Sequence, residues 1–137
     1  MRRHPAVAAL IVVPLLFSSG AARADCAASN TEFDDFYCDA KLFIAADDDL
    51  NAAYKALTAK LGEPPRQSET IAVLKMSQRA WMEKRNEECG RTDSDGYYVD
   101  LSCAVDFTRN RTEFLSARKA ECDAGQCDAG KMTAVDN

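Results

Sequence analysis

Apolar side chains between residues 31 and 61 recur at alternating spacings of three and four, the pattern of one long α-helix. Asn30 or Thr31 can cap its start, because Asp34 stands three residues after Thr31. Gly62 is suited to end the helix, and the Pro-Pro pair that follows stops any continuation. The row consists of Phe36, Ala40, Phe43, Asp47, Leu50, Tyr54, Leu57 and Leu61, and Asp47 interrupts it.

Two further segments, residues 68–89 and about 103–122, show the same spacing and predict two more helices. A polar loop, residues 90–102, separates them, and the small and polar residues 123–137 are expected to form a flexible tail. The short connection between the first two helices makes them antiparallel neighbours. We therefore predict an all-α fold, a small disulfide-stapled bundle in which a long antiparallel helical hairpin packs with a third helix.

The first 24 residues have the pattern of a secretory signal peptide. Two arginines precede an apolar run, residues 7–17, and Ala22-Arg23-Ala24 is a cleavage site with small residues. The run is too short to span a bilayer, so no membrane insertion is expected after cleavage. The mature chain would begin at Asp25, with residues 25–122 as its helical domain, in the periplasm or outside the cell. The residues before Cys26 do not support lipidation.

Charge and composition narrow the function of the mature chain. The signal peptide holds three of the 17 basic residues, none of the 22 acidic ones and the one histidine, so the mature net charge is −8. An acidic chain is unsuited to nucleic acid. Without histidine it lacks Ser-His-Asp and Cys-His catalysis and every His-containing zinc site. We expect a binding protein with no enzymatic activity, no metal and no cofactor.

All six cysteines lie in the mature chain, and an even number in a small exported domain predicts three disulfides. The length of the third helix places Cys122 far from the other helical cysteines, so Cys127 is its expected partner. The remaining four, Cys26, Cys38, Cys89 and Cys103, could pair as Cys26–Cys38 with Cys89–Cys103. They could equally pair as Cys38–Cys89 with Cys26–Cys103, and the sequence does not decide between these alternatives.

Four polar residues stand where the helical patterns call for apolar ones: Asp47, Gln78, Arg85 and Arg111. Buried charges are costly unless they are paired and hydrogen-bonded. We interpret the four as an internal Asp–Arg network that fixes the helix register. The alternative is a polar functional site in a groove between helices.

The loop at residues 90–102 combines acids with two tyrosines and is the candidate partner-binding segment. A calcium loop is excluded because the first and last positions of that motif would be Arg91 and Ser102, where acids are required. Exposed tyrosines on a tethered loop are good contact residues for a protein partner. The acidic run at residues 47–49 is a second possible landing surface for a cationic partner. The loop candidates are Asp93, Asp95, Tyr97, Tyr98 and Asp100.

Three blocks of residues together resemble a known family. They are Ala46-Asp47-x-x-Leu50-Asn51-x-x-Tyr54, Leu74-x-x-x-Gln78-Arg79-Ala80-Trp81-x-x-x-Arg85-x-x-x-Cys89 and Cys103-x-x-x-x-Thr108-x-x-Arg111-Thr112-x-x-Leu115. In this order they resemble the LprI-like family of exported bacterial lysozyme-inhibitor domains, over about residues 26–115. The resemblance implies an all-helical exported domain that inhibits lysozyme. Cys122 and Cys127 look like additions to the four cysteines of that family.

The expected function is therefore that this acidic protein binds lysozyme or a similar cationic cell-wall hydrolase and inhibits it. The alternative is a structural or stress-related module of the envelope with no hydrolase target.

Overall fold

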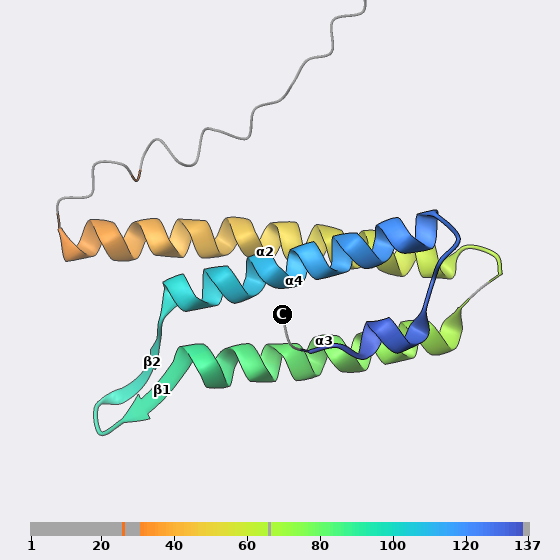
Figure 1. Ribbon diagram of the computed structural model, residues 1–137. Helices are drawn as coiled ribbons and strands as arrows, with labels where there is room; N and C mark the ends of the chain where they lie inside the picture. Colours follow the sequence, from red (N-terminus) through yellow and green to blue (C-terminus); the bar gives the residue numbers. More distant parts are fainter. Residues whose placement is uncertain (1–25, 27–30, 66, 136–137) are drawn as a thin grey trace, which may run out of the picture.

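The computed structural model describes residue 26, residues 31–65 and residues 67–135, so the predicted signal peptide lies outside the described residues. The predicted all-α bundle is confirmed, with one small hairpin added (Figure 1). None of the helices in these ranges is long and apolar enough to span a membrane. The elements are α2 (Glu32–Gly62), α3 (Ser68–Cys89), β1 (Gly90–Asp93), β2 (Gly96–Val99), α4 (Leu101–Asp123) and the 3-10 helix η1 (Ala129–Thr133).

Side-chain caps fix where two of the helices begin. The Thr31 hydroxyl accepts a hydrogen bond from the backbone N–H of Asp34 at 3.1 Å, which decides between the two predicted caps. The Asp100 carboxylate accepts one from the backbone N–H of Cys103 at 3.0 Å. Each cap satisfies an N–H that has no partner within its helix. For this reason α4 begins at Leu101, two residues earlier than its apolar pattern indicated.

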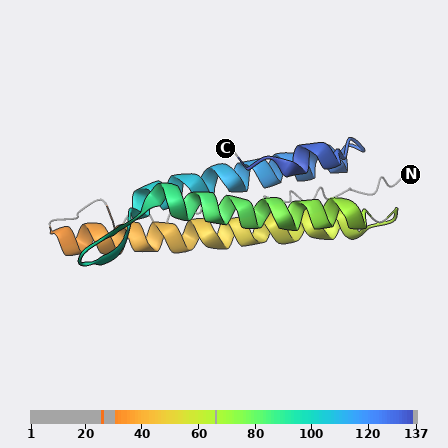
Figure 2. The ribbon, with the colours of Figure 1, turned by 90° about the horizontal axis from the view of Figure 1, so that it is seen from below.

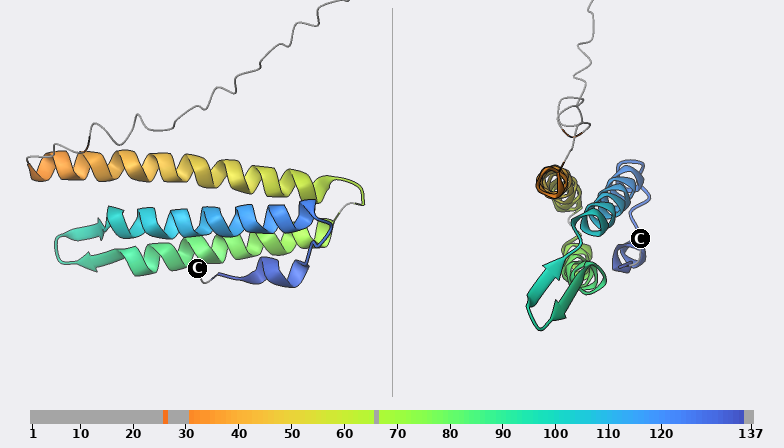
Figure 3. Two further views of the ribbon diagram at one scale, coloured as in Figure 1. Left: turned by 45° about the horizontal axis from the view of Figure 1, so that its top comes forward. Right: turned by 90° about the vertical axis from the view of Figure 1, so that its left-hand side faces the viewer.

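The helices α2 and α3 run antiparallel, as predicted, but the main neighbour of α2 is α4. Viewed end-on, the three helices stand at the corners of a triangle (Figure 3), and their axes share one long direction (Figure 2). The core lies where all three meet. Burying the large apolar side chains of this core provides most of the driving force for folding. Its buried members include Leu50, Leu57, Leu61, Leu74, Trp81 and Leu115.

The residues after α4 fold back onto the bundle, so the expectation of a flexible tail is wrong as far as residue 135. The helix η1 packs against α3, and the Met132 side chain is buried in the core. A disulfide between Cys122 and Cys127 turns the chain back after α4. Met132 and Val135 are too few and too isolated to give an apolar pattern, which is why the sequence did not reveal this segment.

All six cysteines are paired. The predicted Cys122–Cys127 disulfide is confirmed. For the remaining four cysteines, which the sequence left open, the structure has the local pairs Cys26–Cys38 and Cys89–Cys103. The alternative bridge between Cys38 and Cys89 would need α2 beside α3 at that level, whereas α2 packs along α4.

Candidate functional site

The predicted partner-binding loop is a β-hairpin that projects from the end of the bundle. β1 and β2 pair antiparallel, with Asp93 opposite Gly96 across a two-residue turn. The Asp93 carboxylate accepts a hydrogen bond from the backbone N–H of Asp95 at 2.9 Å, which closes this turn. Four-residue strands are too short to show a convincing alternation, so the sequence indicated only a loop.

The base of the hairpin is fixed by three links. The Cys89–Cys103 disulfide joins the end of α3 to the start of α4, and the Asp100 N–H donates to the Cys89 carbonyl at 2.8 Å. The Tyr97 hydroxyl donates to the Asn86 carbonyl at 3.2 Å. Gly90 makes this approach possible, because a Cβ there would overlap both the Asn86 carbonyl oxygen and the Tyr97 hydroxyl. The hairpin is thus held in one orientation relative to the helices.

All five loop candidates are exposed, and one of them, Asp100, is also the cap of a helix. Tyr97 is 59% exposed, and Tyr98 lies under the Arg91 guanidinium, 5.2 Å from the ring centroid. Asp93 and Asp95 are exposed as well. Asp100 is different, because hydrogen bonds from the Cys103 N–H and then the Ser102 hydroxyl lower the pKa of its carboxyl. Its carboxylate therefore serves as the N-cap of α4.

A second set of candidate contact residues lies on the first turns of α2 and was not recognised in the sequence. Phe33 is 74% exposed and Phe36 63%, and Tyr37 and Ile44 are exposed too. Phe36 was expected in the core row. The buried residues of α2 begin only at Ala46, so residues 32–45 extend beyond the core, and we call them the α2 arm. The spacing of Phe33 and Tyr37, one turn apart, was the available signal for this apolar stripe.

The α2 arm and the hairpin project from the same end of the molecule, which we call the forked end (Figure 3). A cleft of about 270 Å³ lies between them. Phe43 contributes from α2, Tyr97 and Val99 from the hairpin, and Arg85 and Asn86 from α3. Acids surround the exposed apolar side chains on both arms. They are Glu32, Asp34, Asp35 and Asp39 on α2, and Asp93 and Asp95 on the hairpin.

The internal polar network is centred on Arg111, which is buried. Its guanidinium donates to Gln78 Oε1 at 3.0 Å, to Ser77 Oγ at 3.1 Å and to the Ala134 carbonyl at 2.7 Å. The Phe114 ring lies 4.5 Å from it. Because none of these partners is charged, desolvation lowers the pKa of Arg111 to about 10. Arg111 and Gln78 are joined as expected, but the partners of the guanidinium are neutral oxygens and not a carboxylate.

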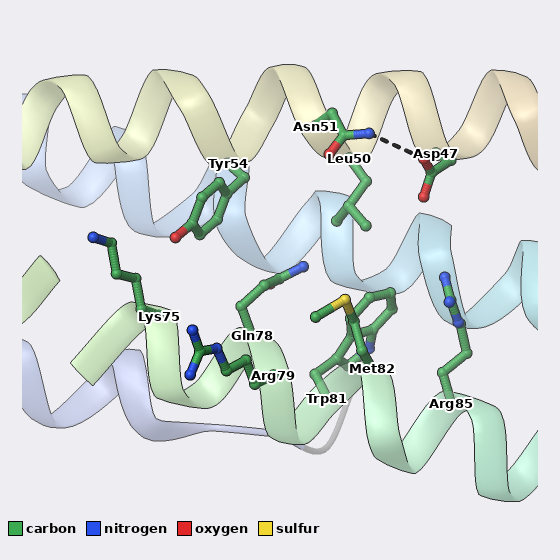
Figure 4. A pocket seen from close by; sticks show the side chains of 10 residues that line it. All are labelled: Asp47, Leu50, Asn51, Tyr54, Lys75, Gln78, Arg79, Trp81, Met82 and Arg85. Atoms are coloured by element: carbon green, nitrogen blue, oxygen red, sulfur yellow. Dashed lines mark hydrogen bonds between the residues drawn. The ribbon is translucent and has the colours of Figure 1, made fainter. Parts of the chain in front are cut away.

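Asp47 and Arg85 lie outside this network and do not form the expected Asp–Arg pair. Asp47 accepts a hydrogen bond from the Asn51 side chain at 3.0 Å. The Arg85 guanidinium lies over the Phe43 and Trp81 rings and donates to Asn86 Oδ1. Both side chains line a groove between α2 and α3 (Figure 4). Each lies on its own side of this groove and is hydrogen-bonded to a neutral side chain of its own helix instead.

Replacing Asp47 with alanine should lower the free energy of unfolding by less than about 1 kcal/mol. The reason is that this carboxylate is partly exposed, and its one hydrogen bond, to Asn51, is on the surface. Thermal unfolding of the variant tests this. A loss of several kcal/mol would mean that Asp47 belongs to a buried ion pair after all.

A family model described as "Lysozyme inhibitor LprI" matches residues 22–115. This match spans more than half of the sequence. The chain belongs to the LprI family. No curated protein and no solved structure gives a significant match.

The LprI match covers the forked end and most of the polar network. It includes α2, α3, the hairpin and α4 as far as Leu115, and so both Gln78 and Arg111. It leaves out the Cys122–Cys127 disulfide and η1, which bring the Ala134 carbonyl to Arg111. In this LprI-family chain, residues beyond the family match therefore complete the hydrogen bonding of a buried charge inside it.

Proposed function

We propose that this protein inhibits lysozyme or a similar cationic cell-wall hydrolase by binding it with the forked end, in the periplasm or outside the cell. Membership of a family of lysozyme inhibitors supports inhibition as the general function. An inhibitor of this kind acts by occupying its target and needs no catalytic group of its own. Three disulfides suit an oxidising compartment.

The observation that carries the proposal is the combination of exposed aromatic side chains and acids on two arms that flank one cleft. Exposed large apolar side chains that gather at one end of a molecule, as Phe33, Phe36 and Tyr97 do on the two arms, mark contact surfaces. The acids around them would steer a basic enzyme toward this end. The aromatic rings would then lose their water against the enzyme and hold the complex.

Charge and aromatic variants should change different rate constants of lysozyme binding. Asp93→Asn with Asp95→Asn should slow association and weaken its dependence on salt, because rim charges act on the encounter. Tyr97→Ala with Tyr98→Ala should raise the dissociation rate by about 30-fold, the equivalent of roughly 2 kcal/mol for a pair of contact residues. Surface plasmon resonance with purified lysozyme measures both rate constants.

Two controls make this test specific. Asp48→Asn with Asp49→Asn removes the same charge from the exposed face of α2 and should leave association nearly unchanged. Tyr97→Phe removes the hydrogen bond to Asn86 but keeps the ring, and it should bind almost as well as the unsubstituted protein. No binding by the unsubstituted protein at low ionic strength would contradict the proposed function. A stronger effect of the Asp48 and Asp49 pair would move the binding surface to the middle of α2.

A further inference from the structure

The groove between α2 and α3 has a charge opposite to that of the chain as a whole. Its volume is about 440 Å³, within the range of pockets that bind small ligands. Three cations line it, Lys75, Arg79 and Arg85, against the single carboxylate of Asp47. The whole chain has a net charge of −5. The cations all come from α3 and face α2 across the groove (Figure 4).

Two of these cations are without a partner among the residues that the structure describes. In the described ranges 31–65 and 67–135, Lys75 and Arg79 form neither an ion pair nor a hydrogen bond. Arg85 donates only to the neutral side chain of Asn86. By contrast, Lys60, Arg118, Lys119 and Lys131 each form an ion pair with an acid. Positive charge in the groove is therefore available to a ligand.

The neutral side chains add more donors to the same groove. The Gln78 amide oxygen already accepts from Arg111, which leaves its NH₂ group for the groove (Figure 4). The Tyr54 hydroxyl is a further donor opposite Lys75. The acceptors, Asp47 and Asn51, are bonded to each other toward the Arg85 end. The middle of the groove is thus rich in donors, and a ligand that fits it must supply acceptors.

We propose that this groove binds a short acidic peptide, of about four residues, through its carboxylates. From Lys75 to Arg85 the helix rises by about 15 Å, which an extended peptide spans in four to five residues. Carboxylates on such a peptide would meet Lys75, Arg79 and Arg85 in turn, and Arg can hold one through two parallel hydrogen bonds. The Asn51 amide oxygen offers an acceptor for a peptide N–H. This site shares Arg85 with the cleft of the forked end, but Lys75 and Arg79 line the groove and not that cleft, and the proposal does not rest on the proposed function.

Titration calorimetry with tetraglutamate, at low ionic strength and on the protein as secreted, tests the proposal. Tetraglutamate should bind saturably, and uncharged tetraglutamine should not. Arg79→Gln should weaken binding by about tenfold or more, the value of a charge-assisted hydrogen bond, and adding Lys75→Gln should weaken it further. Both side chains are exposed, so the fold should be kept.

The matched control is Arg109→Gln, which removes one exposed arginine on α4, outside the groove. It should leave the affinity for tetraglutamate within about twofold, since an exposed charge that does not touch the peptide interacts with it only weakly through water. Arg79→Gln should also leave lysozyme binding unchanged. The proposal is overturned if tetraglutamate does not bind, or if Arg79→Gln and Arg109→Gln weaken it equally. It is overturned too if inorganic phosphate binds with the same dependence on Arg79 while tetraglutamate does not.

Discussion

Replacing Arg111 with alanine should lower the free energy of unfolding by about 4 kcal/mol. The substitution leaves a cavity beside Trp81 and Phe114. It also leaves the Gln78 side chain and the Ala134 carbonyl without the donor that now satisfies them. Burial lowers the pKa of Arg111 only to about 10, so the group is charged at neutral pH and the loss should appear there in full.

Thermal or urea unfolding measures this effect, with Arg109→Ala as its control. Arg109 lies two residues away on the same helix but is exposed, so its replacement should change stability by no more than about 0.5 kcal/mol. Arg111→Lys keeps the positive charge but cannot make the three hydrogen bonds of the planar guanidinium. Its free energy of unfolding should therefore lie between those of the Arg111→Ala and Arg109→Ala variants. Equal stability of the Arg111 and Arg109 variants would contradict the role assigned to the network.

Removing the Cys89–Cys103 disulfide, by replacing both cysteines with serine, should destabilise the protein and weaken lysozyme binding together. The loop-closure model gives about 3 kcal/mol for a bridge that spans 14 residues. This disulfide forms the base of the hairpin, so its loss frees the hairpin to take many orientations, and binding must then restore one of them. The free energy of unfolding and the dissociation rate from lysozyme are the two measurements.

The disulfide at the other end of α4 is the matched control. The same double replacement at Cys122 and Cys127 removes a bridge that spans five residues, for which the model gives about 2 kcal/mol. Since this bridge is remote from the forked end, the variant should keep its affinity for lysozyme wherever it remains folded. If both double variants bind as the unsubstituted protein does, the fixed orientation of the hairpin has no part in binding.

The sequence predicts the helices well because their signals are local. The row from Ala40 to Leu61, the Thr31 cap and the proline pair each act within a few residues, and α3 has the predicted bounds. Which helix packs on which is not local. The short connection made α3 the obvious neighbour of α2, but the groove-facing residues of the two helices are largely polar, whereas α4 brings Leu115 to the core. The apolar spacing within α2 therefore does not predict that Phe36 is exposed.

The sequence indicated one part of the candidate site, the hairpin, but not the other, the α2 arm. The hairpin residues stand out because acids and tyrosines gather in a segment with turn residues, and all five candidates are exposed there. The α2 arm does not stand out, since an aromatic stripe on a helix looks the same whether a partner helix or solvent lies beside it. The partners of Arg111 could not be predicted either. One of them is the backbone carbonyl of residue 134. Since every residue has a backbone carbonyl, the residue type does not reveal which one accepts from Arg111.

The disulfide connectivity has a consequence for how the protein matures. The six cysteines form disulfides in consecutive pairs: the first with the second, the third with the fourth and the fifth with the sixth. A polypeptide that emerges from a translocation pore with its N-terminus first presents its thiols in that same order. If each thiol is oxidised with the next to appear, every bridge formed is the native one. If the chain is exported as proposed, its maturation needs a thiol oxidant but no enzyme that reshuffles wrong pairs.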